Sequence, residues 1–258
     1  MEGHESAVLY AVKHTTTEGI ITMSLLGLMS LSSWMVIVGK ALGLRRQSRL
    51  ADRFYAAFEE APEPLALVGR DEFEGAPPYS VYDYACRELQ KQLARFAPPP
   101  EKANGGPSGR RAPSRVLAAI RAAMERGIGD EGVRLGAGMV ILALAISGGP
   151  FVGLTGTVFG VMEVFSGVAQ AGQANLSAMA PGVAGALINT VLGLIVAIPA
   201  LFAYNMLNRR IDSLTLDMTN FASELEATFV IDYVDAGGAA SEGGARREVH
   251  ASDLATTH

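Results

Sequence analysis

The most informative absence in this chain is the lack of lysine and arginine over a long central stretch. Between Arg134 and Arg209, 74 residues carry no basic side chain, and Glu163 is the only charged residue among them. Two apolar segments fill this stretch, 135–167 and 178–208. A helix that spans a bilayer needs about 20 apolar residues. Both segments are therefore predicted to be transmembrane helices, and because both exceed that length we expect them to extend into the cytoplasm.

Side chains that act as nucleophiles or metal ligands in other proteins are scarce as well. Cys86 is the only cysteine, so no internal disulfide can form. We interpret it as a small apolar residue on a helix face rather than as a catalytic thiol. The four histidines lie near the two ends of the chain, without the spacing of a metal site or of a nucleophile and its base. There is no phosphate-binding loop, and a net charge of −5 offers no basic face for nucleic acid. We expect no enzyme activity, no metal, no cofactor and no nucleic-acid partner.

A third apolar segment, 19–39, has no charged residue, and its 21 residues match about one hydrocarbon thickness. It lacks the basic n-region and the cleavage site of a signal peptide, so we interpret it as an uncleaved span. Basic residues follow this span, precede the second and follow the third, whereas the polar hairpin at 168–177 has none. The positive-inside rule then predicts a periplasmic N-terminal segment, 1–18, a cytoplasmic 40–134 loop and a cytoplasmic C-terminus.

The predicted cytoplasmic parts show helical periodicity too. Leu50, Phe54 and Phe58 recur every four residues within the 40–134 loop, and a similar stripe predicts a helix over 209–234. The composition of 97–113 (APPPEKANGGPSGRRAP) is typical of a flexible linker, and that of 235–258 of disorder. The fold class is therefore all-α: an integral membrane protein with three transmembrane helices.

The second and third spans are rich in small residues, which a helix facing only lipid does not need. At membrane depth, such residues indicate close helix packing or a polar path. The candidate packing residues are Gly153, Gly156, Gly160, Gly182 and Gly193. Prolines inside a helix bend it or mark its start, which we expect at Pro150, Pro181 and Pro199.

Three motifs carry a resemblance to a known family. They are Gly149–Met162 (GPFVGLTGTVFGVM) in the second span, with Leu176–Ala184 (LSAMAPGVA) and Gly193–Ala200 (GLIVAIPA), followed by Tyr204 and Asn205, in the third. Together they resemble the MotA/TolQ/ExbB proton channel family, and within it the ExbB and TolQ branch. The resemblance is dense over roughly 147–211.

The resemblance implies a homopentameric ring in the bacterial inner membrane. The pore of such a ring holds the transmembrane helices of a small ExbD- or TolR-like partner, a single-span protein with an aspartate in the membrane. Proton flow through the complex moves it and energises a TonB-like or TolA-like protein that acts at the outer membrane. Membrane lipid surrounds the ring.

One position departs from the branch. Its members usually carry a glutamate in a pattern like APGIAEAL, where this chain reads APGVAGAL and has Gly185 in the glutamate's place. The family's pore-lining threonines correspond to Thr157 and Thr190. Asn189 is four residues after Gly185, hence on the same helix face. We place Asn189 in the pore lining, with a hydrogen bond to a neighbouring helix as the alternative.

Glu163 lies close to the predicted periplasmic hairpin. A solvated or inter-subunit carboxylate is one interpretation of it, and a proton carrier in the path through the membrane is the other. For Thr157 and Thr190, the alternative to pore lining is a hydroxyl bonded to a carbonyl of its own helix.

Two functions are compatible with the sequence. In the first, the chain is a channel subunit of a proton-driven motor, and the partner's aspartate carries the proton. In the second, it is a non-conducting pentameric scaffold that has lost proton transfer at Gly185. An enzyme is not indicated, because no catalytic constellation is present.

Overall fold

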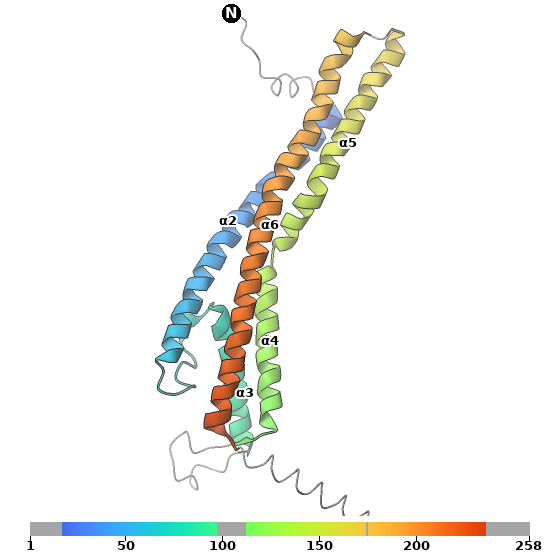
Figure 1. Cartoon of the computed structure of the whole chain (residues 1–258). Coiled ribbons are helices and arrows are strands. Elements are labelled where there is room, and N and C mark those ends of the chain that lie inside the picture. Colours follow the sequence, from blue (N-terminus) through green and yellow to red (C-terminus); the bar gives the residue numbers. More distant parts are fainter. Residues whose placement is uncertain (1–16, 97–111, 174, 236–258) are drawn as a thin grey trace, which may run out of the picture. The chain divides into compact units, whose positions relative to one another are not determined.

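The computed structural model describes residues 17–96, 112–173 and 175–235. Five α-helices account for most of them (Figure 1): α2 (Thr17–Glu59), α3 (Pro77–Phe96), α4 (Val116–Gly136), α5 (Met139–Ala171) and α6 (Leu176–Tyr233). A short 3-10 helix covers Asp71–Phe73, and two-residue strands cover Ala112–Pro113 (β1) and Val234–Asp235 (β2). The expectation of an all-α fold is confirmed for the described residues, whereas the oligomeric ring stays a prediction.

Three of the helices are long and apolar enough to cross a membrane, namely α2, α5 and α6. They coincide with the three apolar segments of the sequence, which confirms the expectation of three spanning helices. Their bounds are wider than the expected spans, because the helices continue into polar sequence. α2 has 43 residues and includes both the 19–39 span and the Leu50–Phe58 stripe. It ends at Glu59, just before Pro62 and Pro64, which cannot continue a helix.

The expected third span, 178–208, and the helix at 209–234 form one uninterrupted helix, the 58-residue α6. Pro181 and Pro199 lie inside α6, and Pro150 lies inside α5. Proline removes one hydrogen bond of the helical ladder and can bend the helix. The bends expected at these three positions stay predictions.

The second span differs from the expected single helix. The segment 135–167 is divided at Gly138, which has φ 82°, so that α4 ends at Gly136 and α5 begins at Met139. A positive φ ends a helical run, and glycine adopts it without a steric penalty. At the other end, Gly172 also has a positive φ, 67°, and its N–H donates to the carbonyl of Val168. The hairpin is therefore shorter than the expected 168–177, since α5 reaches Ala171 and α6 starts at Leu176.

The chain divides into two compact units. The first, which we call the apolar unit, consists of the residues up to Gly43 together with Gly136–Arg210. Its helices pack around a small core formed by Leu26, Ala145, Val196 and Ala200, which brings α2, α5 and α6 together. The second, which we call the aromatic unit, consists of Leu44–Leu135 and the residues from Ile211 onward.

The core of the aromatic unit is built on Phe54. This ring is fully buried, and the centroids of six other aromatic rings lie 5.5–6.2 Å from its own. One of them is Phe221, which is edge-on at 5.5 Å. Phe221 belongs to the stripe expected at 209–234, so the two stripes read from the sequence pack on one another. Edge-to-face aromatic pairs of this kind add about 0.5–1.5 kcal/mol to the burial of their area.

A two-residue parallel ladder closes the aromatic unit, with Ala112 opposite Val234 and Pro113 opposite Asp235. These residues belong to the ends of the expected linker, 97–113, and the expected disordered tail, 235–258. Residues 112, 113 and 235 therefore depart from those two expectations. The rest of the linker and of the tail lies outside the described residues, as do residues 1–16 of the N-terminal segment.

Candidate functional site

The helices α5 and α6 meet along small residues. Gly149, Gly153, Gly156 and Gly160 recur on one face of α5 and are all buried. They face Ala186, Asn189 and Gly193 of α6. We call these seven residues the glycine seam. Without side chains in the way, the two backbones approach closely, as is common between helices in membranes.

The close approach leaves no room for a methyl group. A Cβ atom added at Gly153 would lie 2.6 Å from the carbonyl oxygen of Asn189, and one added at Gly193 would lie 2.6 Å from that of Gly149. At Gly160 the nearest atom would be the Cβ of Ala186, at 2.7 Å, and at Gly182 it would be a methyl of Val164, at 2.5 Å. The glycines singled out in the sequence therefore sit at the tightest helix contacts.

Two hydroxyl groups meet beside the seam. The oxygens of Thr157 on α5 and Thr190 on α6 are 2.5 Å apart. The Thr157 hydroxyl is also 3.1 Å from the carbonyl of Gly153 in its own helix and 3.2 Å from that of Ala186 in α6. One hydroxyl has a single proton to donate, so these acceptors compete for it. Both the intrahelical bond and the contact between the two threonines are thus present in the structure.

Asn189 lies on the other side of this contact. Its side chain is fully buried, its amide is packed against Gly156, and its Oδ1 accepts a bond of 3.4 Å from the Thr22 hydroxyl of α2. Thr22 also bonds the carbonyl of Gly19 at 2.9 Å. Among the described residues, the Nδ2 of Asn189 has no hydrogen-bond partner. The structure thus shows a hydrogen bond between α2 and Asn189, and its place in a pore lining stays a prediction.

The helical geometry separates the two polar features. Successive residues in an α-helix point about 100° apart, so Asn189 and Thr190 leave α6 in different directions. Asn189 points to α2, whereas Thr190 points to Thr157. Gly185, which replaces the family glutamate, is buried and lies one turn from Asn189 on the same face.

Glu163 is separate from both features. It is exposed and lines a cleft of about 530 Å³ between the ends of α5 and α6. Small and apolar residues make up most of the other walls, among them Gly167, Ala178 and Gly182. The structure therefore brings Thr157 and Thr190 together and Asn189 close behind them, but it does not bring Glu163 to that group.

Thr22 is the residue that the sequence did not reveal. It lies in a span that also contains Ser24, Ser30, Ser32 and Ser33, and nothing in the sequence separates it from these other hydroxyl residues. Its position became clear only from the packing of α2 on the glycine seam.

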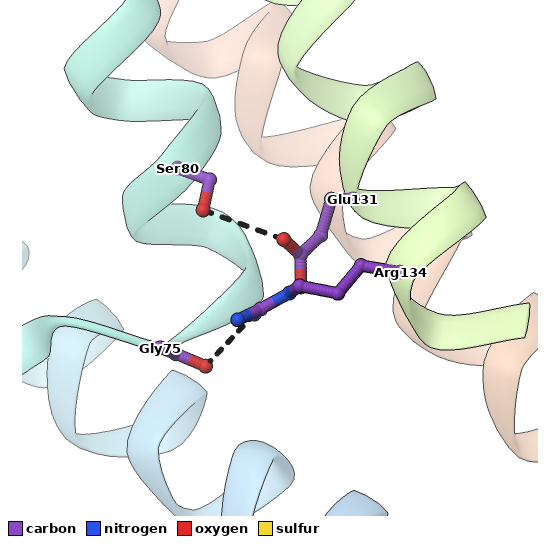
Figure 2. Close-up of polar contacts among 4 residues, drawn as sticks. All are labelled: Gly75, Ser80, Glu131 and Arg134. Atoms are coloured by element: carbon purple, nitrogen blue, oxygen red, sulfur yellow. Dashed lines mark hydrogen bonds and ion pairs between the residues drawn. The ribbon is translucent and has the colours of Figure 1, made fainter. Parts of the chain in front are cut away.

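A second polar cluster lies in the aromatic unit (Figure 2). Glu131 of α4 is 4% exposed, and its carboxylate accepts a 3.0 Å bond from Nε of Arg134 and a 3.4 Å bond from the hydroxyl of Ser80 on α3. Arg134 also donates to the carbonyl of Gly75 at 3.2 Å. A buried carboxylate needs such partners, because an unpaired one is strongly destabilising. Among the residues described, no group of His, Cys, Asp and Glu side chains forms a metal site.

Comparison with known proteins places this arrangement in a family. The sequence profile of the MotA/TolQ/ExbB proton channel family matches residues 107–220, which include α4, α5, the glycine seam and both threonines. The Tol-Pal system protein TolQ of Pseudomonas aeruginosa is 33% identical over 198 residues, which cover 77% of this chain and 81% of that protein. The chain belongs to the MotA/TolQ/ExbB proton channel family.

Other members of the family are similar to comparable degrees. The biopolymer transport protein ExbB of Xanthomonas campestris pv. campestris is 31% identical over 202 residues, or 78% of this chain and 77% of that protein. ExbB of Salmonella typhimurium is 41% identical over 102 residues, or 40% of this chain and 42% of that protein. The chain is therefore a multi-pass membrane protein of a channel family and belongs among transport proteins rather than enzymes.

Proposed function

We propose that this chain is the ring-forming subunit of a motor in the bacterial inner membrane, driven by the proton-motive force. It works with an ExbD- or TolR-like single-span partner and energises a TonB- or TolA-like protein. Five copies surround the partner's helices. The N-terminus is periplasmic and the C-terminus cytoplasmic, as the distribution of basic residues predicts.

The observation that carries this proposal is the hydroxyl pair of Thr157 and Thr190, 2.5 Å apart at membrane depth in the family-matched helices. Each hydroxyl can both donate and accept a hydrogen bond. Thr157 has further acceptors within reach, the carbonyls of Gly153 and Ala186, so the pair can change partners as a proton passes. A threonine cannot hold the proton itself, however, and a carrier must come from elsewhere.

The partner's membrane aspartate is that carrier in our proposal, because Gly185 leaves this chain without a carboxylate at the family position. Thr157 and Thr190 form the polar contacts of the aspartate, and Asn189 stands behind them as an amide held between α2, α5 and α6. The driving force is sufficient, since one charge that crosses 100 mV releases about 2.3 kcal/mol.

An apolar outer surface favours assembly in the membrane. Large side chains of α5 and α6 are exposed in the single chain, including Phe151, Leu154, Phe159, Ile195 and Phe202. Neighbouring copies and lipid would cover them in a pentamer. Native mass spectrometry should show five copies, and a stable dimer or trimer as the sole assembly would contradict the ring.

Proton flux tests the proposed path. The chain and its partner would be reconstituted in liposomes with a pH-sensitive dye inside and a potential imposed across the membrane. Thr190→Val and Thr157→Val remove a hydroxyl with little change in shape, so flux should fall sharply in both. Thr155→Val is the matched control on α5, because the exposed Thr155 hydroxyl only bonds the carbonyl of Phe151 in its own helix. Its flux should stay at the level of the unmodified complex.

Two further variants separate the alternatives. Asn189→Leu keeps the approximate shape of the side chain and removes the amide, and we expect it to lower flux through its effect on the neighbouring threonines. Glu163→Gln removes the only carboxylate of the two spans. If Glu163→Gln abolishes flux while both threonine variants conduct, Glu163 is the carrier and our assignment is wrong.

The non-conducting scaffold is the second candidate function, favoured by a single observation, Gly185 in place of the family glutamate. An unmodified complex that assembles as a ring but conducts no protons would establish it. A partner protein without an aspartate in its span would point the same way.

A further inference from the structure

A buried amide connects α2 to the part of α6 that carries Thr190. Asn189 is fully buried, and its Oδ1 accepts a 3.4 Å hydrogen bond from the hydroxyl of Thr22. Its Nδ2 has no hydrogen-bond partner among the described residues. A polar side chain in an apolar interior is destabilising unless hydrogen bonds hold it. The place of this amide therefore depends on Thr22.

The Thr22 hydroxyl can hold the amide in either of its two orientations. In the first, Thr22 donates to Oδ1 of Asn189. Half a turn of the amide about its Cβ–Cγ bond exchanges Nδ2 and Oδ1, and Nδ2 then donates to the Thr22 oxygen. In that case the Thr22 proton stays with the carbonyl of Gly19, 2.9 Å away. A hydroxyl both donates and accepts, whereas an apolar side chain of the same shape could hold neither orientation.

Helix α5 provides the opposite wall for the amide. A Cβ atom added at Gly156 would lie 2.9 Å from both Cγ and Nδ2 of Asn189 and 2.6 Å from the Thr22 hydroxyl. One turn earlier on α5, a Cβ added at Gly153 would lie 2.6 Å from the carbonyl oxygen of Asn189 and 3.1 Å from the Cα of Thr190. The side chain and the backbone of Asn189 are thus both packed against α5, and Thr22 holds the amide from α2.

The position of Thr190 is linked to that of Asn189, because the two residues are consecutive in one helix. The Cα atoms of an α-helix lie about 2.3 Å from its axis, so a rotation of α6 by about 20° moves each of them by about 0.8 Å. Such a rotation away from Thr157 would lengthen the 2.5 Å contact between the two hydroxyls to about 3.3 Å. Hydrogen bonds between hydroxyls extend to about 3.0 Å, so a small rotation of α6 is enough to separate the pair.

We propose that Thr22 is a positioning residue for proton transfer. Through its hydrogen bond with the Asn189 amide, α2 fixes the rotation of α6 that brings Thr190 to Thr157. This inference rests on the proposed function, in which the threonine pair contacts the partner's carboxylate. It adds the first span to a path that is otherwise formed by α5 and α6.

Proton flux through the complex in liposomes tests this role. Thr22→Val keeps the shape of the side chain and removes the hydroxyl. We expect flux to fall about threefold, the factor that corresponds to an average hydrogen bond between helices in a membrane, about 0.6 kcal/mol. Thr22→Ser retains the hydroxyl and should retain the flux. Ser24→Ala is the matched control on α2, since the Ser24 hydroxyl bonds the carbonyl of Ile20 in its own helix. Equal losses in Thr22→Val and Ser24→Ala, or the same loss in Thr22→Ser, would refute the role of the hydroxyl.

A double variant shows whether Thr22 acts through Asn189. Asn189→Leu removes the amide, so the addition of Thr22→Val to this variant should leave its flux unchanged. A further threefold fall in the double variant would mean that Thr22 acts independently of Asn189, and it would overturn the proposal.

Disulfide formation between positions 157 and 190 reports the geometry of the pair without a measurement of flux. Thr157→Cys and Thr190→Cys are combined in a Cys86→Ala background, and the assembled complex is oxidised with copper phenanthroline. A disulfide needs its Cβ atoms about 3.5–4.5 Å apart, so its rate of formation depends on the rotation of α6. Disulfides within one protomer are counted in the monomer-sized band by mass spectrometry. Thr22→Val should lower this rate and Thr22→Ser should not.

The two readouts separate this inference from the proposed function. An unchanged disulfide rate in Thr22→Val overturns the positioning role, even in a complex that conducts protons. If the unmodified complex conducts no protons and Thr22→Val still lowers the disulfide rate, α2 does fix the rotation of α6, and the proposed function is the part that fails.

Discussion

Replacement of Gly153 in the glycine seam by alanine should destabilise the protein, because it adds a methyl group where α5 and α6 are closest. In Gly153→Ala, the new methyl group would lie 2.6 Å from the carbonyl oxygen of Asn189 and 3.1 Å from the Cα of Thr190. Both are backbone atoms of α6, which cannot rotate away as the end of a side chain could. An ordinary contact begins near 3.4 Å, so α5 and α6 must separate by about 0.8 Å locally.

Such overpacking costs about 1–3 kcal/mol in a well-packed interior. The separation also lengthens the contact between Thr157 and Thr190, which are adjacent to the seam. We therefore expect Gly153→Ala to lower the thermal unfolding midpoint in detergent or nanodiscs and to weaken proton flux in the same preparation. Gly27→Ala on α2 is the control, because a Cβ there meets nothing within 4 Å. In the control, alanine replaces glycine within a helix and should leave stability unchanged or raise it by up to about 1 kcal/mol.

The two variants together test whether α5 and α6 approach closely at Gly153. If Gly153→Ala unfolds at the same temperature as the unmodified protein, the close backbone approach along the seam is incorrect. If both variants are destabilised equally, the loss reflects glycine removal in general and not the contact with Asn189.

Three predictions concern the aromatic unit. Cys86 is fully buried and burial raises the pKa of its thiol, so it should resist thiol reagents in the native protein and react only after unfolding. Arg134→Gln leaves the buried carboxylate of Glu131 without its cation and should cost about 1–3 kcal/mol, which the double variant with Glu131→Gln should partly restore in urea titrations. Burial raises the pKa of Tyr55 above its ordinary value of about 10, so the folded form keeps its proton where the unfolded form loses it. The stability that this provides is present below about pH 10 and is lost as the pH rises above it, and Tyr55→Phe should reduce that dependence in urea midpoints measured across the range.

The burial of Cys86 also affects how topology should be tested. A thiol inside the aromatic core does not report whether the 40–134 loop faces the cytoplasm, because reagents cannot reach it on either side. Gln90 is exposed on α3, and Gln90→Cys in a Cys86→Ala background provides an accessible reporter. It should react with an impermeant reagent only after permeabilisation, and labelling in intact cells would contradict the predicted orientation.

The sequence was sufficient to predict the helices, because hydropathy and periodicity report on segments. The uncharged runs gave three spanning helices, and the Leu50–Phe58 stripe together with that of 209–234 gave two sides of the aromatic core. The division at Gly138 was not predictable, since Gly132, Gly136 and Gly138 all lie in the same region and only one backbone angle distinguishes the residue that ends the run. The two-residue ladder of Ala112 and Val234 was likewise hidden, because it joins positions far apart in the chain.

The contacts between helices at the candidate site were harder to predict than the helices themselves. Spacing indicated correctly which residues share a face of α6, Gly185 with Asn189, but it could not indicate what that face meets. The answer depends on α2, which is distant in sequence, and on Thr22, which no motif marks. Thr157 and Thr190 were found by resemblance alone, and their 2.5 Å contact is a property of how α5 and α6 pack.

The position of Asn189 bears on the missing glutamate. Gly185 and Asn189 are one turn apart on α6. Asn189 accepts a hydrogen bond from Thr22 of α2, whereas Thr190 contacts Thr157 of α5. Asn189 and Thr190 therefore leave α6 about 100° apart, Asn189 beside α2 and Thr190 beside Thr157. With Gly185 in the glutamate's place, the contact between Thr157 and Thr190 is still present. In our proposal these hydroxyls contact the partner's carboxylate, and for that reason we favour a conducting subunit over a scaffold.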